Sequence, residues 1–134
     1  MKIYCFFAFL LMMVSDSAFC RVINVDAFQA CMDRTQHDRL NCQSGCGMIL
    51  QQCYDEGVAD VNKRINEVDS VIKSKNGAAC ASLAEGYLSQ ASRVADDVVQ
   101  KANNLTGWIG SDLSLALARQ RLESLKLIQQ SCKP

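Results

Sequence analysis

The stretch CMDRTQHDRLNCQSGCGMILQQC, residues 31–53, contains four of the chain's eight cysteines. Cys31 and Cys53 each lie eleven residues from Cys42, so they would face each other across a helical hairpin that turns near Cys42. Cys42 and Cys46 are only four residues apart around Ser44-Gly45, which is close enough for a local bond. The spacing therefore predicts disulfides Cys31–Cys53 and Cys42–Cys46, and the alternative pairing is Cys31–Cys46 with Cys42–Cys53.

The N-terminal segment predicts the compartment in which these disulfides form. Met1-Lys2 precedes the apolar run 3–14, and small residues follow it, as in a secretory signal peptide. We expect residues 1–20 to be the signal peptide and residues 21–134 to be a single secreted helical domain. Cleavage after Ser17 is the alternative, but cleavage after Cys20 leaves an even number of cysteines, which suits an oxidising compartment. The remaining cysteines are Cys31, Cys42, Cys46, Cys53, Cys80 and Cys132.

The charge balance bears on the class of partner. The chain carries 14 basic and 14 acidic side chains, and no run of basic residues is longer than the pair Lys63-Arg64. Proteins that bind nucleic acid usually present a strongly basic surface that displaces counterions from phosphates, so we expect no nucleic-acid partner. We also expect no membrane span, because the apolar run 3–14 has twelve residues and a spanning helix needs about twenty.

Apolar residues recur at steps of three and four along most of the remaining chain, which is the period of one helix face. The first stripe comprises Leu50, Tyr54, Val58, Val61, Ile65, Val68 and Ile72. The second comprises Cys80, Ala84, Tyr87, Ala91, Val94, Val98, Ala102 and Leu105. The third comprises Leu115, Ala118, Leu122, Leu125, Ile128 and Cys132. A shorter amphipathic stretch, residues 26–39, precedes them.

The breaks between the stripes predict how the helices connect. Asn76-Gly77 is expected to end the first long helix with a left-handed cap, and residues 107–110 to separate the second from the third, with Ser111 as the N-cap. Short connections make consecutive helices antiparallel. We therefore predict an all-α fold, a small disulfide-stapled antiparallel bundle of one short N-terminal helix and three long helices. Cys80 and Cys132 would then meet at one end of the bundle and form the third disulfide.

Some of the same cysteines have neighbours that metal ligands or nucleophiles would need. Cys42, Cys46, Cys53 and His37 could supply four zinc ligands, but their spacing is not that of a zinc finger, and thiols in an oxidising compartment form disulfides. His37 lies in a polar segment, which favours an exposed side chain over a catalytic base. The sequence contains no glycine-rich phosphate loop and no serine elbow. We therefore expect a protein that is not an enzyme and that uses no metal and no cofactor.

Two connections carry the candidate binding and modification residues. Asn104-Leu105-Thr106 is an acceptor sequence for N-linked glycosylation. Trp108, the only tryptophan, would either cap the end of the bundle or stand exposed as a binding anchor. The candidate binding residues lie at the hairpin tip and in the turn around this tryptophan: Gln43, Ser44, Gly45, Gly47, Trp108 and Ile109.

One scattered pattern of residues covers about thirty-five positions: Cys31, Thr35-Gln36, Leu40-Asn41-Cys42 and Ile65-Asn66. This pattern resembles a family of small bacterial periplasmic helical proteins that includes lysozyme inhibitors. The spacing differs by about one residue, Cys46-Gly47 has no counterpart, and the family's tryptophan and arginine motif is not reproduced around Trp108. The resemblance implies inhibition of a foreign enzyme by a surface loop.

A rigid scaffold without a catalytic constellation indicates a secreted, noncatalytic protein that binds another protein, as an extracellular signal, a salivary or venom component, or an inhibitor. The alternative is a carrier, in which the leucines of the last helix line a cavity for a small apolar ligand. Membrane-active helices are disfavoured by the zero net charge. Long stripes of this kind also serve self-association, so a homo-oligomer is a further expectation to test.

Overall fold

The computed structural model describes residues 26–132, and this part of the chain contains only helices and their connections. The helices are α1 (Ala27–Arg34), α2 (Gln36–Asn41), α3 (Cys46–Lys75), α4 (Ala78–Ala102) and α5 (Ile109–Ser131). The all-α, disulfide-stapled bundle predicted from the sequence is confirmed. The expected signal peptide, residues 1–20, lies outside the described residues.

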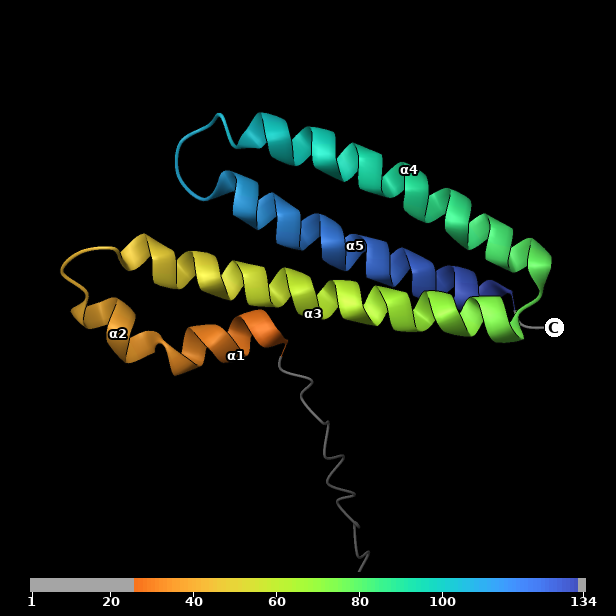
Figure 1. The fold of residues 1–134 in the computed structure, drawn as a ribbon, viewed down its shortest axis with the longest axis horizontal. Helices are drawn as coiled ribbons and strands as arrows, with labels where there is room; N and C mark the ends of the chain where they lie inside the picture. The colour runs from red at the N-terminus through yellow and green to blue at the C-terminus, as the bar shows by residue number, and fades with distance from the viewer. Residues whose placement is uncertain (1–25, 133–134) are drawn as a thin grey trace, which may run out of the picture.

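Consecutive long helices run antiparallel, so α3 and α5 point the same way, and α5 lies between α3 and α4 (Figure 1). α3 and α4 lie close together at their connection, Asn76-Gly77, and diverge toward the opposite end of the bundle. α1 runs back along α3, while α2 and the tip 42–45 lie at the divergent end together with the α4–α5 connection. Segments far apart in the sequence therefore meet at this end.

The short N-terminal helix is divided at Thr35, which the sequence analysis did not predict. The Thr35 N–H and the Thr35 hydroxyl both donate to the carbonyl oxygen of Cys31, at 2.9 and 2.8 Å. Threonine side chains that bond to the backbone in this way compete with helical hydrogen bonds and bend helices. The chain turns here, and α2 follows as a separate helix of six residues.

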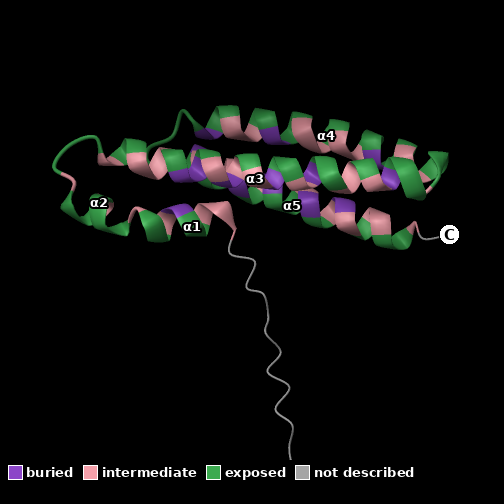
Figure 2. Ribbon diagram, turned by 60° about the horizontal axis from the view of Figure 1, so that its bottom comes forward, coloured by how far each residue is buried: buried purple, intermediate pink, exposed green. Residues whose placement is uncertain are grey.

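The core forms where the predicted stripes of α3 and α5 face each other (Figure 2). Its buried members are Tyr54, Val61, Ile65, Ile72, Ala84, Leu115, Ala118, Leu122 and Leu125. The second stripe was only partly correct. Its members Ala84 and Ala102 are buried as predicted, but Val94 and Leu105 are exposed, and α4 also buries Ala95, which the stripe did not include. α4 also ends at Ala102, before Leu105.

Two of the predicted helix ends need correction in detail. Gly77 has the expected positive φ of 85°, but its ψ of 164° is extended and not that of a left-handed cap. Ser111 is not the N-cap of α5, because the helix begins at Ile109 with Trp108 at the cap position. At the other end of the bundle Asn76 Nδ2 donates to the carbonyl oxygens of Gln129 and Cys132, at 3.2 and 2.9 Å. Asn76 thus satisfies carbonyls that the end of α5 leaves without helical partners.

Residues 26–132 contain three disulfides, in the pairing that the helical hairpin and the bundle topology predicted. Cys31–Cys53 joins α1 to α3, Cys42–Cys46 closes the tip between α2 and α3, and Cys80–Cys132 joins the start of α4 to the end of α5. Cys31 and Cys53 are completely buried. Within residues 26–132 no helix is both long enough and apolar enough to cross a membrane.

Candidate binding surface at one end of the bundle

The two candidate binding segments, the tip around residues 43–47 and the turn at Trp108, meet at the divergent end of the bundle. Gly47 lies under the indole of Trp108: a Cβ atom at Gly47 would stand 3.1 Å from Cζ2 and 3.3 Å from Cη2 of that ring. Such distances are tighter than ordinary carbon contacts, so the absence of a side chain at residue 47 allows the close approach. The two predicted segments therefore form one surface.

Trp108 rests on a row of aromatic rings that leads into the core. Its ring centroid lies 6.2 Å from that of Tyr54, and the Tyr54 ring lies 4.9 Å from that of Phe28 in α1. These separations are typical of favourable aromatic pairs. One side of the indole is covered by Gly47 and Tyr54, and 36 % of the residue stays exposed. Trp108 thus packs against the end of the bundle and still presents part of its ring to solvent.

Tyr54 is fixed by a hydrogen bond as well as by packing. Its hydroxyl donates to Asp112 Oδ1 on the first turn of α5. Burial raises the pKa of Tyr54 to about 12, and the hydrogen bond to Asp112 and the negative charge of that carboxylate add to the effect. The phenol therefore remains protonated at neutral pH and joins α3 to α5 beneath Trp108.

Exposed apolar side chains concentrate at the same end. Of the eight large hydrophobic residues that are exposed within residues 26–132, five lie in α2, at the start of α3, or in and next to the α4–α5 connection. We call them the end face: Leu40, Met48, Leu105, Trp108 and Ile109. Leu40 and Met48 are the most exposed of these, at 76 % and 79 %. Exposed apolar groups gathered in one region commonly mark interaction sites.

The segments that form the end face carry no charged residue. Residues 40–54 and 102–111 contain only apolar, hydroxyl, amide, cysteine and glycine positions. The cores of protein interfaces are depleted in charged residues and enriched in tryptophan and methionine. The composition of the end face fits such an interface core.

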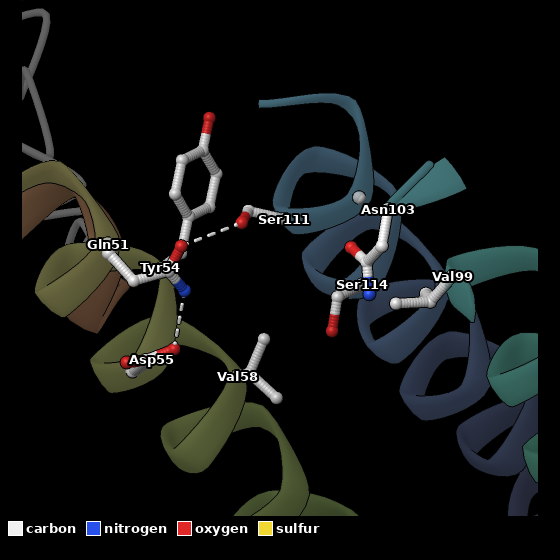
Figure 3. A pocket seen from close by; sticks show the side chains of 9 residues that line it. Gln51, Tyr54, Asp55, Val58, Val99, Asn103, Ser111 and Ser114 are labelled. Atoms are coloured by element: carbon white, nitrogen blue, oxygen red, sulfur yellow. Dashed lines mark hydrogen bonds between the residues drawn. The ribbon is translucent and has the colours of Figure 1, made fainter. Parts of the chain in front are cut away.

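A cleft of about 330 Å³ lies behind the end face, between α3 and α4, with α5 as its floor (Figure 3). Gln51 spans its α3 side: its Oε1 accepts from the Ser111 hydroxyl at 3.0 Å, and its Nε2 donates to Asp55 Oδ1 at 2.8 Å. Asn103 packs directly on Gly110, where a Cβ would stand 2.0 Å from the amide oxygen. Gln51, Asp55 and Ser111 are thus already bonded to each other, and Asn103 packs against the backbone of α5.

The carrier alternative required leucines of the last helix to line a cavity. Leu115, Leu122 and Leu125 instead lie in the core with 3 % exposure or less. The cleft is polar and open to solvent. These observations give the carrier alternative no support.

The remaining candidate residues lie as follows. Asn104 is exposed in the connection that also carries Leu105 and Trp108, so a glycan on Asn104 would stand next to the end face. His37 is exposed on α2, and the cysteines proposed as zinc ligands are all in disulfides. Among residues 26–132 no cluster of histidine, cysteine, aspartate or glutamate could hold a metal ion.

Sequence reasoning missed Leu40 and Met48 and assigned Leu105 to the core. The only signal was position: all three are apolar residues within three positions of a predicted connection. No protein-family model, curated protein or solved structure matches this chain. The partial resemblance to periplasmic lysozyme inhibitors therefore gains no support, and the assignment of function rests on the geometry of the chain.

Proposed function

We propose that this chain is a secreted, noncatalytic protein that binds another protein through its end face. The observation that carries the proposal is the meeting of two uncharged connections at one end of a disulfide-stapled scaffold, where Trp108 and four further large apolar side chains are exposed. The scaffold holds these side chains in place before binding, which lowers the entropic cost of association. Secretion is supported by the signal-like N-terminus and by the three disulfides.

A partner of this surface would offer an apolar groove or pocket for Trp108 and Met48. Aromatic side chains anchored in pockets dominate the affinity of many interfaces, and the surrounding contacts mainly exclude water. The uncharged end face offers nothing to steer a charged partner, so we expect association that depends weakly on ionic strength.

Site-specific photo-cross-linking tests the placement of the interface. A photoreactive amino acid replaces Met48 on the end face in one preparation, and Asn66 on the solvated face of α3 in a matched control. Both proteins, produced with all disulfides formed, are added to extracellular fluid of the source organism and illuminated. We expect one adduct of defined mass from position 48 and none of that mass from position 66. Adducts that are the same at both positions, or none at position 48, would overturn the placement.

Intact mass measurement tests the secretory part of the proposal. Protein recovered from the medium of secreting cells should have the mass of residues 21–134 less six hydrogens, with an added glycan where Asn104 is modified. Retention of the full chain inside the cells would contradict secretion. The same measurement under native conditions tests the carrier alternative, because a bound apolar ligand would add a mass that is lost on denaturation.

A further inference from the structure

The three disulfides differ in how the folded chain holds their sulfur atoms. Cys31 and Cys53 are completely buried between α1 and α3. Cys80 packs against the core, and the carbonyl oxygen of Cys132 accepts from Asn76 Nδ2 at 2.9 Å. We therefore expect the surrounding structure to keep the two sulfur atoms of each of these bonds together even when the bond itself is open.

Cys42 and Cys46 lie in a different setting. Both are partly exposed, and all the residues between them are exposed, as are their outer neighbours Asn41 and Gly47. Neither cysteine belongs to the core or packs against it. We call their bond the tip disulfide. A thiol in solution can reach it, and access to the sulfur atoms is one determinant of the rate of thiol–disulfide exchange.

The tip also offers each of these sulfur atoms a partner once the bond is reduced. Cys46 is the first residue of α3, and the N-cap residue Gly45 has no side chain to bond the free N–H groups of this helix end. Free N–H groups at a helix N-terminus stabilise a thiolate. Sγ of Cys42 lies 3.0 Å from the carbonyl oxygen of Ser44, which can accept from the S–H that this cysteine gains on reduction. Cys46 is therefore the better leaving group, and Cys42 is the sulfur that an external thiolate attacks.

The attachment of α2 to α3 depends on the tip disulfide. α2 has six residues, and none of them is buried. In the described chain its side-chain hydrogen bonds run to α1 or stay within α2: Arg39 donates to the carbonyl oxygen of Met32, and Asn41 to that of His37, both at 2.8 Å. A helix of this length is not stable by itself in water. Opening the tip disulfide would therefore release α2 from α3.

We propose that the tip disulfide is a redox-labile bond that regulates the end face; the regulatory part rests on the proposed function. Leu40 on α2 and Met48 at the start of α3 lie on either side of this bond. The closed bond holds the two exposed side chains in one arrangement. When the bond is open, Leu40 moves with α2, and the end face loses the preorganisation that lowers the cost of binding.

The reductant of this reaction is a dithiol, a molecule or protein with two neighbouring thiols. One of its thiolates attacks Sγ of Cys42, the S–S bond breaks, and Cys46 leaves as a thiolate with the bonding electron pair. The second thiolate of the reductant attacks its own sulfur in the mixed disulfide, which releases Cys42 and closes a disulfide in the reductant. Two electrons and two protons thus pass from the dithiol to the tip, which ends with two thiols.

Selective labelling tests the lability of the bond independently of any partner. The oxidised protein is equilibrated with dithiothreitol at graded ratios of reduced to oxidised reagent and quenched with acid, and its free thiols are alkylated and mapped by mass spectrometry. We expect half-labelling of Cys42 and Cys46 at a ratio at least about tenfold lower than for the other four cysteines. Circular dichroism at that ratio should show an intact bundle. Labelling of Cys80 and Cys132 at the same or a lower ratio would overturn the proposal.

Two single variants test the direction of the attack. Cys42→Ser leaves Cys46 as the one thiol of the tip, and Cys46→Ser leaves Cys42. At neutral pH iodoacetamide should alkylate Cys46 in the first variant at least about threefold faster than Cys42 in the second, because the start of α3 stabilises the thiolate. The reverse order would contradict the assignment of Cys46 as the leaving group.

Hydrogen exchange tests the release of α2. The protein with both Cys42→Ser and Cys46→Ser has a permanently open tip and is compared with the oxidised wild type. Amides of residues 37–41 should exchange at least about tenfold faster in the double variant. Amides of α3 around Cys53 should be unchanged, because the Cys31–Cys53 disulfide still ties α1 to α3. Equal exchange of residues 37–41 in both proteins would overturn the release of α2.

Photo-cross-linking from position 48 tests the regulation of the end face. The photoreactive amino acid is placed at this position in the oxidised protein and in the double variant, which cannot reoxidise. The adduct yield should fall at least about tenfold in the double variant. Equal yields would overturn the regulation. If the oxidised protein itself forms no adduct, the proposed function is contradicted instead, and the labelling and exchange measurements still decide whether the tip disulfide is labile and holds α2.

Discussion

Tyr54 is the residue that connects the end face to the interior of the bundle. Its ring lies between Phe28 and Trp108, and its hydroxyl bonds to Asp112 on α5. The neighbouring carboxylate disfavours the phenolate, and so does burial, which is the larger cause of its raised pKa. Titration of this one residue is therefore coupled to folding.

This coupling predicts a loss of stability at alkaline pH. The folded-state pKa of Tyr54 is about 12, compared with 10.0 for an unperturbed tyrosine. The unfolded chain therefore loses its proton first, and the stabilisation present below pH 10 is lost as the pH rises toward 12. We expect a decrease on the order of 2 kcal/mol in the free energy of unfolding, measured with urea at a series of pH values.

Tyr54→Phe is the control for this measurement, because it keeps the ring and removes the titrating hydroxyl. Its free energy of unfolding should be lower than that of the wild type at neutral pH and nearly constant where the wild type declines. An equally steep decline in both proteins would assign the alkaline transition to other groups, such as Lys73, whose pKa is raised by Asp69.

The short helix α1 depends on contacts with the rest of the chain for its conformation. It has eight residues, fewer than an isolated helix needs in water. Asp26 caps it by accepting from the Gln29 N–H at 2.9 Å, and the Cys31–Cys53 disulfide ties it to α3. It also approaches α3 closely at Gly57, where a Cβ would stand 2.8 Å from Cβ of Phe28; the same Cβ would stand 3.1 Å from Cδ1 of Leu115 in α5.

Gly57→Ala should therefore destabilise the fold although alanine is the better helix former. The added methyl group must displace α1, and overpacking of this kind costs about 1–3 kcal/mol, against a gain of about 1 kcal/mol from helix propensity. Gly86→Ala, inside α4 with open space around it, should be more stable than the wild type by about 0.5–1 kcal/mol. Urea unfolding of the two variants and the wild type at low protein concentration measures both changes in the free energy of unfolding. Stabilisation by both substitutions would show that α1 does not pack closely on residue 57.

The helices were predictable from the sequence because their signal is local. The stripe from Leu50 to Ile72 lies within α3, and the period of its apolar residues follows from helix geometry alone. α4 carries apolar residues on more than one side, and periodicity alone does not tell which side faces the core. The prediction that Val94 is buried was therefore wrong. Ser111 was likewise a plausible cap by residue type, but the start of α5 depends on how Asn103 packs against Gly110.

For the molecule as a whole, the candidate binding segments were predictable one at a time but their meeting was not. Gly47 and Trp108 are each recognisable next to a connection, yet their contact depends on the direction in which α3 and α5 enter the bundle. Two of the disulfides, Cys31–Cys53 and Cys80–Cys132, followed from topology because each joins neighbouring antiparallel helices. The third, Cys42–Cys46, followed from its spacing of four residues. Long-range contacts between connections leave no comparable pattern in one sequence.

The disulfides also predict how the stability of the whole bundle is distributed. A crosslink restricts the unfolded chain more as the loop it closes becomes longer. Cys80–Cys132 spans 52 residues and Cys42–Cys46 spans four. In the chain-entropy model these loops correspond to stabilisation of about 4 and about 2 kcal/mol. The long bond also holds the helix ends that Asn76 caps, whereas the short one closes only an exposed tip.

Replacing both cysteines of each bond by serine tests this distribution. The Cys80→Ser and Cys132→Ser protein should lose about 4 kcal/mol of its free energy of unfolding. It should also show a larger urea m-value, because its unfolded state becomes more expanded. The Cys42→Ser and Cys46→Ser protein removes the same number of sulfur atoms and should stay within about 2 kcal/mol of the wild type, with an unchanged m-value. Equal losses of free energy of unfolding in the two proteins would contradict this distribution. Interactions at the tip would then outweigh loop entropy, and the tip would be a structural element of the bundle as well as part of its binding surface.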